Sequence, residues 1–443
     1  LLRLHRLHHR RLRPPSGQVG RAASMSDGLL IREYQPSDSE ACLQLEISGS
    51  ELRFGGGLIS AAFWHYQDFA AKARQFSAHL IFVCEDVRAG SAICGVIAVA
   101  IKQLWAHGEE VLCGYVFDLR VDSAYRKRGI GSSLTVAAET GAKDLGVKYF
   151  YLTVNGSNLV AQKLYTRLGW VRASRRCLIF RPLLLPVYTS RRDASMAARR
   201  GCVRQLTKEE ALNLVCAHYA RRDLGLSRAE FERLFESPNL LATFAATDAP
   251  AASDQSPGCS TAALVLWNGS TLTGFKAVRF FLPIDVWTKL SPLAPAAFAL
   301  VITSALGILW AGAAQTFLSK FACIGTVLSA VTSLIGYEWA RSRTAFRARI
   351  FAPVAEGPAW EPLMRVVYEA AYSEARARGF ATIVINIDED SPVASALVGH
   401  RKKSSDSVLD APPAFWQKRI GDGDPSSRLG PLGADSFFDP RDI

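Results

Sequence analysis

The sequence predicts a mixed α/β (α+β) fold, on three kinds of observation. Short runs rich in β-branched and aromatic residues, such as 147–154, alternate with segments whose apolar residues recur at helical spacing, such as 158–168. A glycine-rich loop at 126–131 joins an apolar run to a helical segment. The chain has 443 residues and a hydrophobic content of 49%, so we expect two or three domains with cores of ordinary size.

The first half of the chain is predicted to alternate strands with helices. Pro36 suits the first turn of a helix, and Gly146 and Gly169 stand where a glycine commonly ends one. The predicted strands are 29–34, 79–85, 93–104, 111–121, 147–154, 172–180 and 183–188, the predicted helices are 36–47, 61–76, 132–145 and 158–168, and 191–200 is a predicted linker.

The glycine-rich loop has the features of a pyrophosphate-binding turn. Gly129 and Gly131 let the backbone turn tightly, and the helix that follows directs its unpaired N–H groups and positive dipole end outward. Arg126, Lys127 and Arg128 add positive charge, which suits a ligand with a pyrophosphate and a ribose phosphate, such as coenzyme A. The alternative is an ordinary turn with a solvated basic rim. A dinucleotide fold would need G-x-G-x-x-G and a later acidic residue, and neither is present.

Two polar residues lie on the predicted helix at 158–168. Asn158 and Tyr165 are seven residues apart, which places them two turns apart on one face. Each also has a purely structural interpretation, because Asn158 suits a helix N-cap and Tyr165 suits a core aromatic.

The segment 115–171 resembles the GNAT superfamily of acyl-CoA-dependent N-acetyltransferases. The R-x-x-G-x-G loop and an N-x-x-A-x-x-L-Y pattern carry the resemblance, the latter with Asn158, Ala161, Leu164 and Tyr165. The resemblance implies a GNAT acyl-CoA N-acyltransferase fold with acetyl-CoA as co-substrate and no metal. It implies cofactor contacts from Leu119, Val121, Arg126, Lys127, Arg128, Gly129, Ile130, Gly131, Ser132, Asn158 and Ala161.

The same resemblance implies catalytic roles for two side chains. Tyr165 would protonate the departing thiolate, and Asp118 stands where related enzymes often carry an acid that contacts the amine. The other interpretation of Asp118 is an ion pair with Arg120 on the same strand face. The helix predicted at 61–76 would cover the acceptor site.

Short flanking motifs also resemble the plant HOOKLESS-type N-acetyltransferases. They occur in the same order at 31–36, 186–188, 266–267, 356–358 and 438–441. The likeness is dense in the first half, sparse in the second, and absent between about 290 and 340.

The second half is predicted to repeat the element order of the first. We therefore expect a catalytic domain at 29–190 and a degenerate GNAT-like domain at 201–443. Glu356 and Pro358 stand where the cofactor loop would lie, and they remove basic charge and an N–H donor, so we expect no coenzyme A there. This domain would shape the acceptor site or a partner surface. Its predicted helices are 207–220, 227–236 and 360–379, and its predicted strands are 240–246, 262–267, 271–281, 346–354 and 381–387.

A transmembrane helical hairpin is predicted at 292–337. Residues 291–319 and 321–337 carry no formal charge, and a bilayer core requires about 20 apolar residues per helix. Basic residues on both flanks predict that the rest of the chain faces the cytosol, with Lys320 at the far tip. The alternative is a pair of buried core helices.

The composition excludes several classes of protein. Nine cysteines without C-x-x-C pairs indicate neither a zinc site nor a disulfide framework, which fits the cytosolic side of a membrane. The net charge of +12 comes partly from arginines in residues 1–28, so no compact basic face for nucleic acid is indicated. We expect residues 1–28 to be disordered or presequence-like, or to be translated sequence upstream of Met25.

The predicted function is acetyl transfer from acetyl-CoA to a primary amine by direct attack in a ternary complex. The acceptor could be a protein lysine, a protein N-terminus or a small amine. The alternative function is that of a membrane-tethered pseudoenzyme that binds partners.

Overall fold

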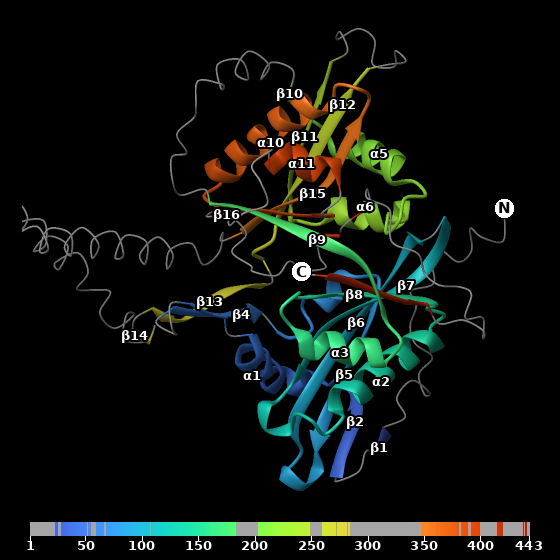
Figure 1. The fold of residues 1–443 in the computed structure, drawn as a ribbon, viewed down its shortest axis with the longest axis vertical. Coiled ribbons are helices and arrows are strands. Elements are labelled where there is room, and N and C mark those ends of the chain that lie inside the picture. The colour runs from blue at the N-terminus through green and yellow to red at the C-terminus, as the bar shows by residue number, and fades with distance from the viewer. Residues whose placement is uncertain are drawn as a thin grey trace, which may run out of the picture.

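One mixed sheet runs through both halves of the chain in the computed structural model (Figure 1). The structure describes residues 23–24, 28–50, 52–54, 59–65, 68–106, 108–182, 203–248, 259–271, 273–280, 282–283, 347–380, 382–388, 391–398, 414–419, 437 and 439–440. Within these residues the sheet has thirteen strands in the order β1-β2-β5-β6-β7-β8-β17-β9-β16-β15-β12-β11-β10.

The first half supplies one side of this sheet and the helices on its two faces. β7 is antiparallel to β6 and parallel to β8, and α2 forms the crossover between β7 and β8. The elements are β1 (Ala23–Ser24), β2 (Leu29–Glu33), η2 (Pro36–Asp38), α1 (Ser39–Ser50), η4 (Ala73–Gln75), β5 (Ala78–Asp86), η5 (Val87–Ala89), β6 (Ala92–Ala106), β7 (Glu109–Val121), η6 (Ser123–Tyr125), α2 (Ile130–Asp144), β8 (Tyr149–Val154), α3 (Leu159–Arg167) and β9 (Val171–Pro182).

The second half has the same plan, because β15 is antiparallel to β12 and parallel to β16, with α10 as the crossover. Its elements are β10 (Val203–Gln205), α5 (Lys208–Tyr219), α6 (Arg228–Glu236), β11 (Leu240–Thr247), β12 (Thr261–Asn268), β15 (Arg347–Glu356), α10 (Trp360–Ala377), β16 (Thr382–Asp388), α11 (Pro392–Val398) and β17 (Ala414–Arg419).

The two halves exchange their last strands. β17, from the second half, lies between β8 and β9 of the first half, while β9 also pairs with β16 of the second half (Figure 1). Side chains reinforce the exchange, since the Tyr149 hydroxyl donates to Gln417 Oε1 at 2.5 Å and Lys418 Nζ lies 2.7 Å from Glu139 Oε2. Neither half completes its part of the sheet without the other.

The core on the α1 side of the sheet also crosses between the halves. One buried cluster contains Leu45 of α1, Tyr115 of β7, Phe231 of α6 and Phe351 of β15. A second cluster packs α2 and α3 on the opposite face and includes Leu134, Phe150, Tyr165 and Trp170. The first-half sheet is therefore covered on both faces.

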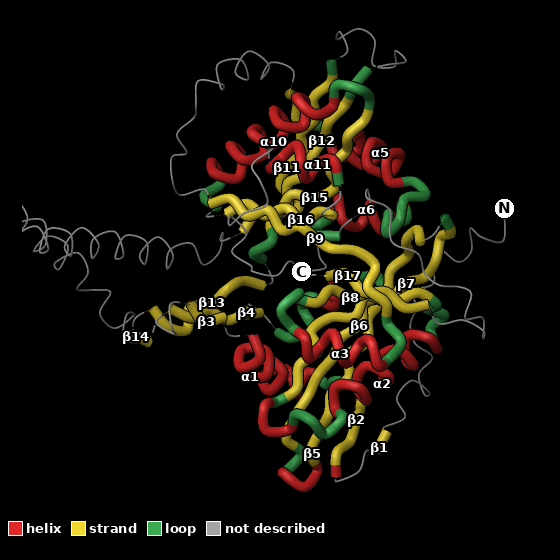
Figure 2. The backbone as a smooth tube through the Cα atoms, viewed as in Figure 1, coloured by secondary structure: helices red, strands yellow, loops and turns green. Residues whose placement is uncertain are grey.

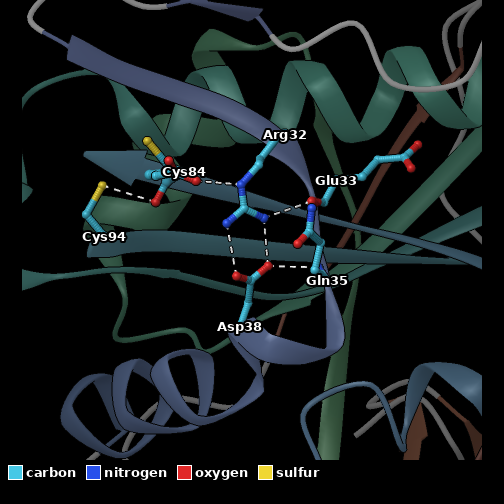
Figure 3. A network of polar contacts seen from close by, with 7 residues as sticks. Arg32, Glu33, Gln35, Asp38, Cys84 and Cys94 are labelled. Carbon is cyan, nitrogen blue, oxygen red and sulfur yellow. Dashed lines mark hydrogen bonds and ion pairs between the residues drawn. The ribbon is translucent and has the colours of Figure 1, made fainter. Parts of the chain in front are cut away.

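Ion pairs of Arg32 with Asp38 and Glu85 hold the start of α1 against this sheet (Figure 3). The Arg32 guanidinium donates to both carboxylate oxygens of Asp38, at 2.7 and 2.9 Å, and to Glu85 Oε2 at 2.5 Å. The Gln35 N–H also donates to Asp38 Oδ2 at 2.7 Å. These bonds set the direction in which α1 leaves β2.

Most predicted elements of both halves are confirmed, but the helix at 61–76 is wrong. Residues Ile59–His65 form a strand, β4, and Ala73–Gln75 form only a turn of 3₁₀ helix. β4 belongs to a small sheet beside α1 (Figure 2), with β3 (Leu52–Phe54), β13 (Thr273–Phe280) and β14 (Leu282–Pro283). Its partner β13 comes from the second half, and such a distant pairing has no local sequence signal.

Several predictions fall outside the described residues. They are the strand at 183–188, the linker at 191–200 and the helical hairpin at 292–337. In the described ranges, no helix is both long enough and apolar enough to cross a bilayer.

Candidate functional site

A β-bulge near the end of β7 marks the candidate site. Val96 faces Arg120 and Ala98 faces Phe117, so Ile97 lies opposite two residues, Asp118 and Leu119. Asp118 has φ of 51°, a left-handed conformation that non-glycine residues seldom adopt. The bulge bends β7 and changes the direction of its last side chains.

β7 and β8 separate just before this bulge. Their parallel pairing covers three residue pairs, from Cys113 with Tyr149 to Tyr115 with Tyr151, and ends there. β7 continues to Val121 with β6 as its neighbour, while β8 pairs with β17 on its other side. Among the described strands, the backbone of 116–121 thus has no partner on its β8 side.

The predicted cofactor loop begins α2 beside this separation. Gly129 is the N-cap of α2 with φ of 80°, and no side chain caps the helix, whereas Asn158, Thr207 and Ser227 cap α3, α5 and α6. A Cβ atom at Gly129 would meet nothing within 4 Å. The N–H groups of the first turn of α2 therefore lack a capping side chain, and the space beside Gly129 is open. An anion could occupy this space and accept these N–H groups.

The basic residues of the loop lie at the surface. Arg126, Lys127 and Arg128 are all exposed, and Lys127 also has a positive φ of 65°. The Arg128 guanidinium lies 5.3 Å from the centre of the Tyr125 ring. These cations immediately precede the uncapped start of α2, so their charge and the helix dipole favour the same kind of ligand.

Three predicted parts of the site meet at Gly131. A Cβ atom there would lie 3.5 Å from Leu164 Cδ2, 3.9 Å from Val121 Cγ2 and 4.0 Å from Leu119 Cδ2. The end of β7, the loop and α3 are thus neighbours.

Asn158 and Tyr165 both have the structural roles considered from the sequence. Asn158 Oδ1 accepts the N–H of Ala161 at 3.0 Å and so caps α3. The Tyr165 ring packs edge-on against Trp170 at 5.6 Å, and only 6% of its surface is exposed. Burial raises the pKa of Tyr165 above its usual value near 10. Its hydroxyl therefore stays protonated at neutral pH and retains a proton to donate.

Asp118 lies in a cluster of buried and half-buried charges on the α1 side of the sheet. Its carboxylate is 3.9 Å from Lys72 Nζ and 4.0 Å from Arg120 Nη2, and Arg120 is also 4.0 Å from Glu46 Oε1. Lys72 Nζ lies 4.6 Å over the Phe117 ring. The ion pair of Asp118 with Arg120 is therefore present, though long. Neither Lys72 nor Glu46 was among the predicted site residues, although the segment that carries Lys72 was expected to cover the acceptor site.

The second half repeats the bulge without the open loop. Leu264 lies opposite Ala352 and Pro353, and Ala352 has φ of 48°. β15 and β16 then separate after four parallel pairs. At the loop that follows, however, a Cβ atom at Gly357 would lie 2.7 Å from the Cys259 carbonyl oxygen.

Residues 259–260 close this second loop. The Ser260 hydroxyl accepts the N–H of Ala359 at 2.8 Å, immediately before α10. His218 Nδ1 lies 2.7 Å from Glu356 Oε1 on the other side. The loop before α10 is thus in close contact with 259–260 at Gly357, two residues before the N-cap Ala359, whereas the loop before α2 is open at its N-cap Gly129.

Comparison with known proteins finds a family similarity over part of the first half. Residues 53–170 match the acetyltransferase (GNAT) family. No curated protein sequence matches the chain significantly. Within the described residues, no three His, Cys, Asp or Glu side chains gather in a way that could hold a metal ion.

Several solved structures are similar to the chain at low sequence identity. One is a GCN5-related N-acetyltransferase from Kribbella flavida, with 14% identity and a TM-score of 0.44 over 89% of this chain and 71% of that one. Another is Saccharomyces cerevisiae N-myristoyltransferase with bound myristoyl-CoA, with 10% identity and a TM-score of 0.48 over 90% of this chain and 84% of that one.

Proposed function

We propose that the chain is an acyl-CoA-dependent N-acyltransferase that moves an acetyl group from acetyl-CoA to a primary amine. The observation that carries the proposal is the uncapped start of α2 at Gly129, which is open and follows three exposed basic residues, near the separation of β7 and β8. The family match of residues 53–170 supports the same reaction class.

The cofactor would lie across the loop and the separated strands. The N–H groups of Ile130, Gly131 and Ser132 would bind the pyrophosphate, with Arg126, Lys127 and Arg128 supplying charge to the phosphates. The pantetheine arm would run past Leu119 and Val121, near Asn158 and Ala161 of α3. The thioester would then reach the unpaired edge of β7.

In the proposed reaction, a neutral amine attacks the thioester carbon in a ternary complex. Backbone N–H groups near Val121 would stabilise the oxyanion, and Tyr165 would donate its proton to the departing thiolate. Asp118 would contact the amine and take up its proton, directly or through water. Burial keeps the Tyr165 hydroxyl protonated, and the proposed donation rests on its place on α3 beside the loop rather than on its acidity.

The second half would serve the first half rather than bind a second coenzyme A. Its loop at Gly357 is filled by 259–260, and β13 pairs with β4 on the α1 side of the first half. We infer that it shapes the acceptor side of the site. From the sequence alone, we also propose that 292–337 attaches the protein to a membrane with the site facing the cytosol.

An acetyl-transfer assay tests this function. Purified protein would be incubated with acetyl-CoA and a panel of protein N-termini, lysine peptides, amino acids and polyamines, with free thiol as the readout. Amine-dependent thiol release supports the enzyme. Tight acetyl-CoA binding with no release for any amine would instead favour a pseudoenzyme that binds partners.

A further inference from the structure

Residues 437, 439 and 440, near the end of the second half, contact both halves of the fold. Phe437 is 1% exposed and lies 5.0 Å, ring to ring, from both Tyr219 and Phe231 of the second half. Its N–H donates to the Asp223 carbonyl at 2.9 Å, and Arg349 of β15 donates to the Pro440 carbonyl. Phe437 and Pro440 are therefore both held by the rest of the second half.

Between these anchors, Asp439 reaches into the first half. Its carboxylate lies 2.9 Å from Lys102 Nζ of β6, and the side chains of both residues are 1% exposed. The Lys102 ammonium is also 5.1 to 5.5 Å from the ring centres of Phe76, Tyr115 and Tyr151. A buried ion pair stabilises a fold less than apolar residues of the same volume often do, so its presence calls for another reason.

The position of Lys102 supplies that reason. Tyr115 and Tyr151 form the last residue pair before β7 and β8 separate. The Lys102 ammonium therefore lies over the point where the two strands separate, called the vertex below. From Tyr115 the contacts continue to the candidate site: Tyr115 stacks on Phe117 at 5.1 Å, and Lys72 lies over Phe117 and beside Asp118. A continuous series of contacts thus joins Asp439 to Asp118.

We propose that Lys102 and Asp439 are positioning residues: their buried ion pair fixes the vertex where β7 and β8 part, and so makes acyl transfer in the first half depend on the second half. The inference rests on the proposed function of the first-half site. It predicts an effect on turnover, whereas the Gly129 loop, on the α2 side, keeps its affinity for acetyl-CoA.

The test compares single and double variants of the full chain. Asp439→Asn leaves Lys102 buried beside a neutral group, and Lys102→Met/Asp439→Leu replaces the pair by apolar side chains of similar size. Asp38→Asn is the matched control, because it removes another buried carboxylate from a cation, on the β2 side of the sheet. Each protein is measured for thermal midpoint, acetyl-CoA Kd, and kcat and KM for the best amine of the panel.

We expect Asp439→Asn to lower the thermal midpoint by about 5 °C or more and kcat by about 10-fold or more, with acetyl-CoA Kd within about 2-fold. The double variant should regain the midpoint but not kcat. Asp38→Asn should lower the midpoint and keep kcat per folded molecule. Recovery of kcat together with stability in the double variant would overturn the proposal, and so would an equal loss of kcat in Asp38→Asn.

Amide hydrogen exchange separates this proposal from the proposed function. Backbone amides of 116–121 should exchange faster in the double variant than in the wild type, while those of 81–86 stay unchanged. If the wild type transfers acetyl to no amine, the proposed function fails, and the exchange result still decides whether the pair fixes the vertex. Unchanged exchange at 116–121 would reject the positioning role.

Discussion

Asp118 and Ala352 adopt the same left-handed backbone conformation, with φ of 51° and 48°, at matching bulges of β7 and β15. Each bulge lies where a strand separates from its parallel neighbour. The halves differ in the loop that follows, which is open at Gly129 and filled at Gly357. The two loops thus differ in whether another segment of the chain packs against them. The first test concerns the open loop at Gly129.

Gly129→Glu should abolish acetyl-CoA binding. The carboxylate would enter the open space where the pyrophosphate is proposed to lie, and its charge would repel the phosphates. Because φ at this position is 80°, any side chain also strains the backbone, by about 1 kcal/mol. Gly129→Ala is the control for this strain and should keep most of the affinity. Calorimetry that found equal affinity for Gly129→Glu and wild type would refute the site.

Tyr165→Phe should lower kcat by about 10- to 10⁴-fold and leave acetyl-CoA affinity nearly unchanged. The ring still fills its place against Trp170, so the fold should persist. Burial raises the pKa of Tyr165, so the wild-type rate should not fall through ionisation of this hydroxyl near its usual pKa of about 10. A parallel loss of affinity and turnover would show that Tyr165 acts only in packing.

Stability should fall steeply in acid because of the Arg32 network in Figure 3. Burial pushes the pKa of Asp38 up, but hydrogen bonds from Arg32 and the Gln35 N–H outweigh it and lower that pKa. Hydrogen bonds from Ser91 and Arg32 also lower the pKa of Glu85. A lowered folded-state pKa stabilises the protein above the unfolded pKa, and this contribution is lost as pH falls through the folded value.

The thermal midpoint should therefore be constant above about pH 5 and drop below about pH 4. Asp38→Asn should have a lower midpoint at neutral pH and a shallower drop in acid. The same acid slope in Asp38→Asn and wild type would show that this carboxylate carries none of the effect.

The candidate site could be predicted from sequence where its signals are local. The order of β7, the Gly129 loop, α2, β8 and α3 follows from runs of residue type, helical spacing and stop glycines within one stretch of chain. The side chains that surround Asp118 could not be predicted in this way. Lys72 lies on a segment that follows β4, and β4 lies between β3 and β13, the second of which comes from the second half.

The exchange of β9 and β17 escaped prediction for a similar reason. β9 was predicted as a strand but β17 was not, and the neighbour of a strand is chosen by packing of the completed sheet. The ion pair of Lys102 with Asp439 joins residues that are far apart in the chain, so no spacing could reveal it.

Membrane attachment remains a prediction from the uncharged residues 291–319 and 321–337. Full-length protein with a tag on the first half should stay in the membrane fraction after carbonate extraction, and the tag should be open to protease added from the cytosolic side. A variant lacking 292–337 is the control and should be released. Release of the intact chain at high pH would reject the attachment.

The last prediction concerns the exchanged strand β17. A fragment that ends at residue 190 lacks β17, so the β17-facing edges of β8 and β9 lose their partner, and Phe415 and Trp416 no longer cover the two cores of the first half. Open strand edges and exposed apolar surface promote aggregation, so this fragment alone should aggregate on expression. Co-expression with a fragment from 201 to 443 should restore a complex that elutes as one species. A monomeric first-half fragment that binds acetyl-CoA by itself would show that the exchange is dispensable and that the first half folds independently.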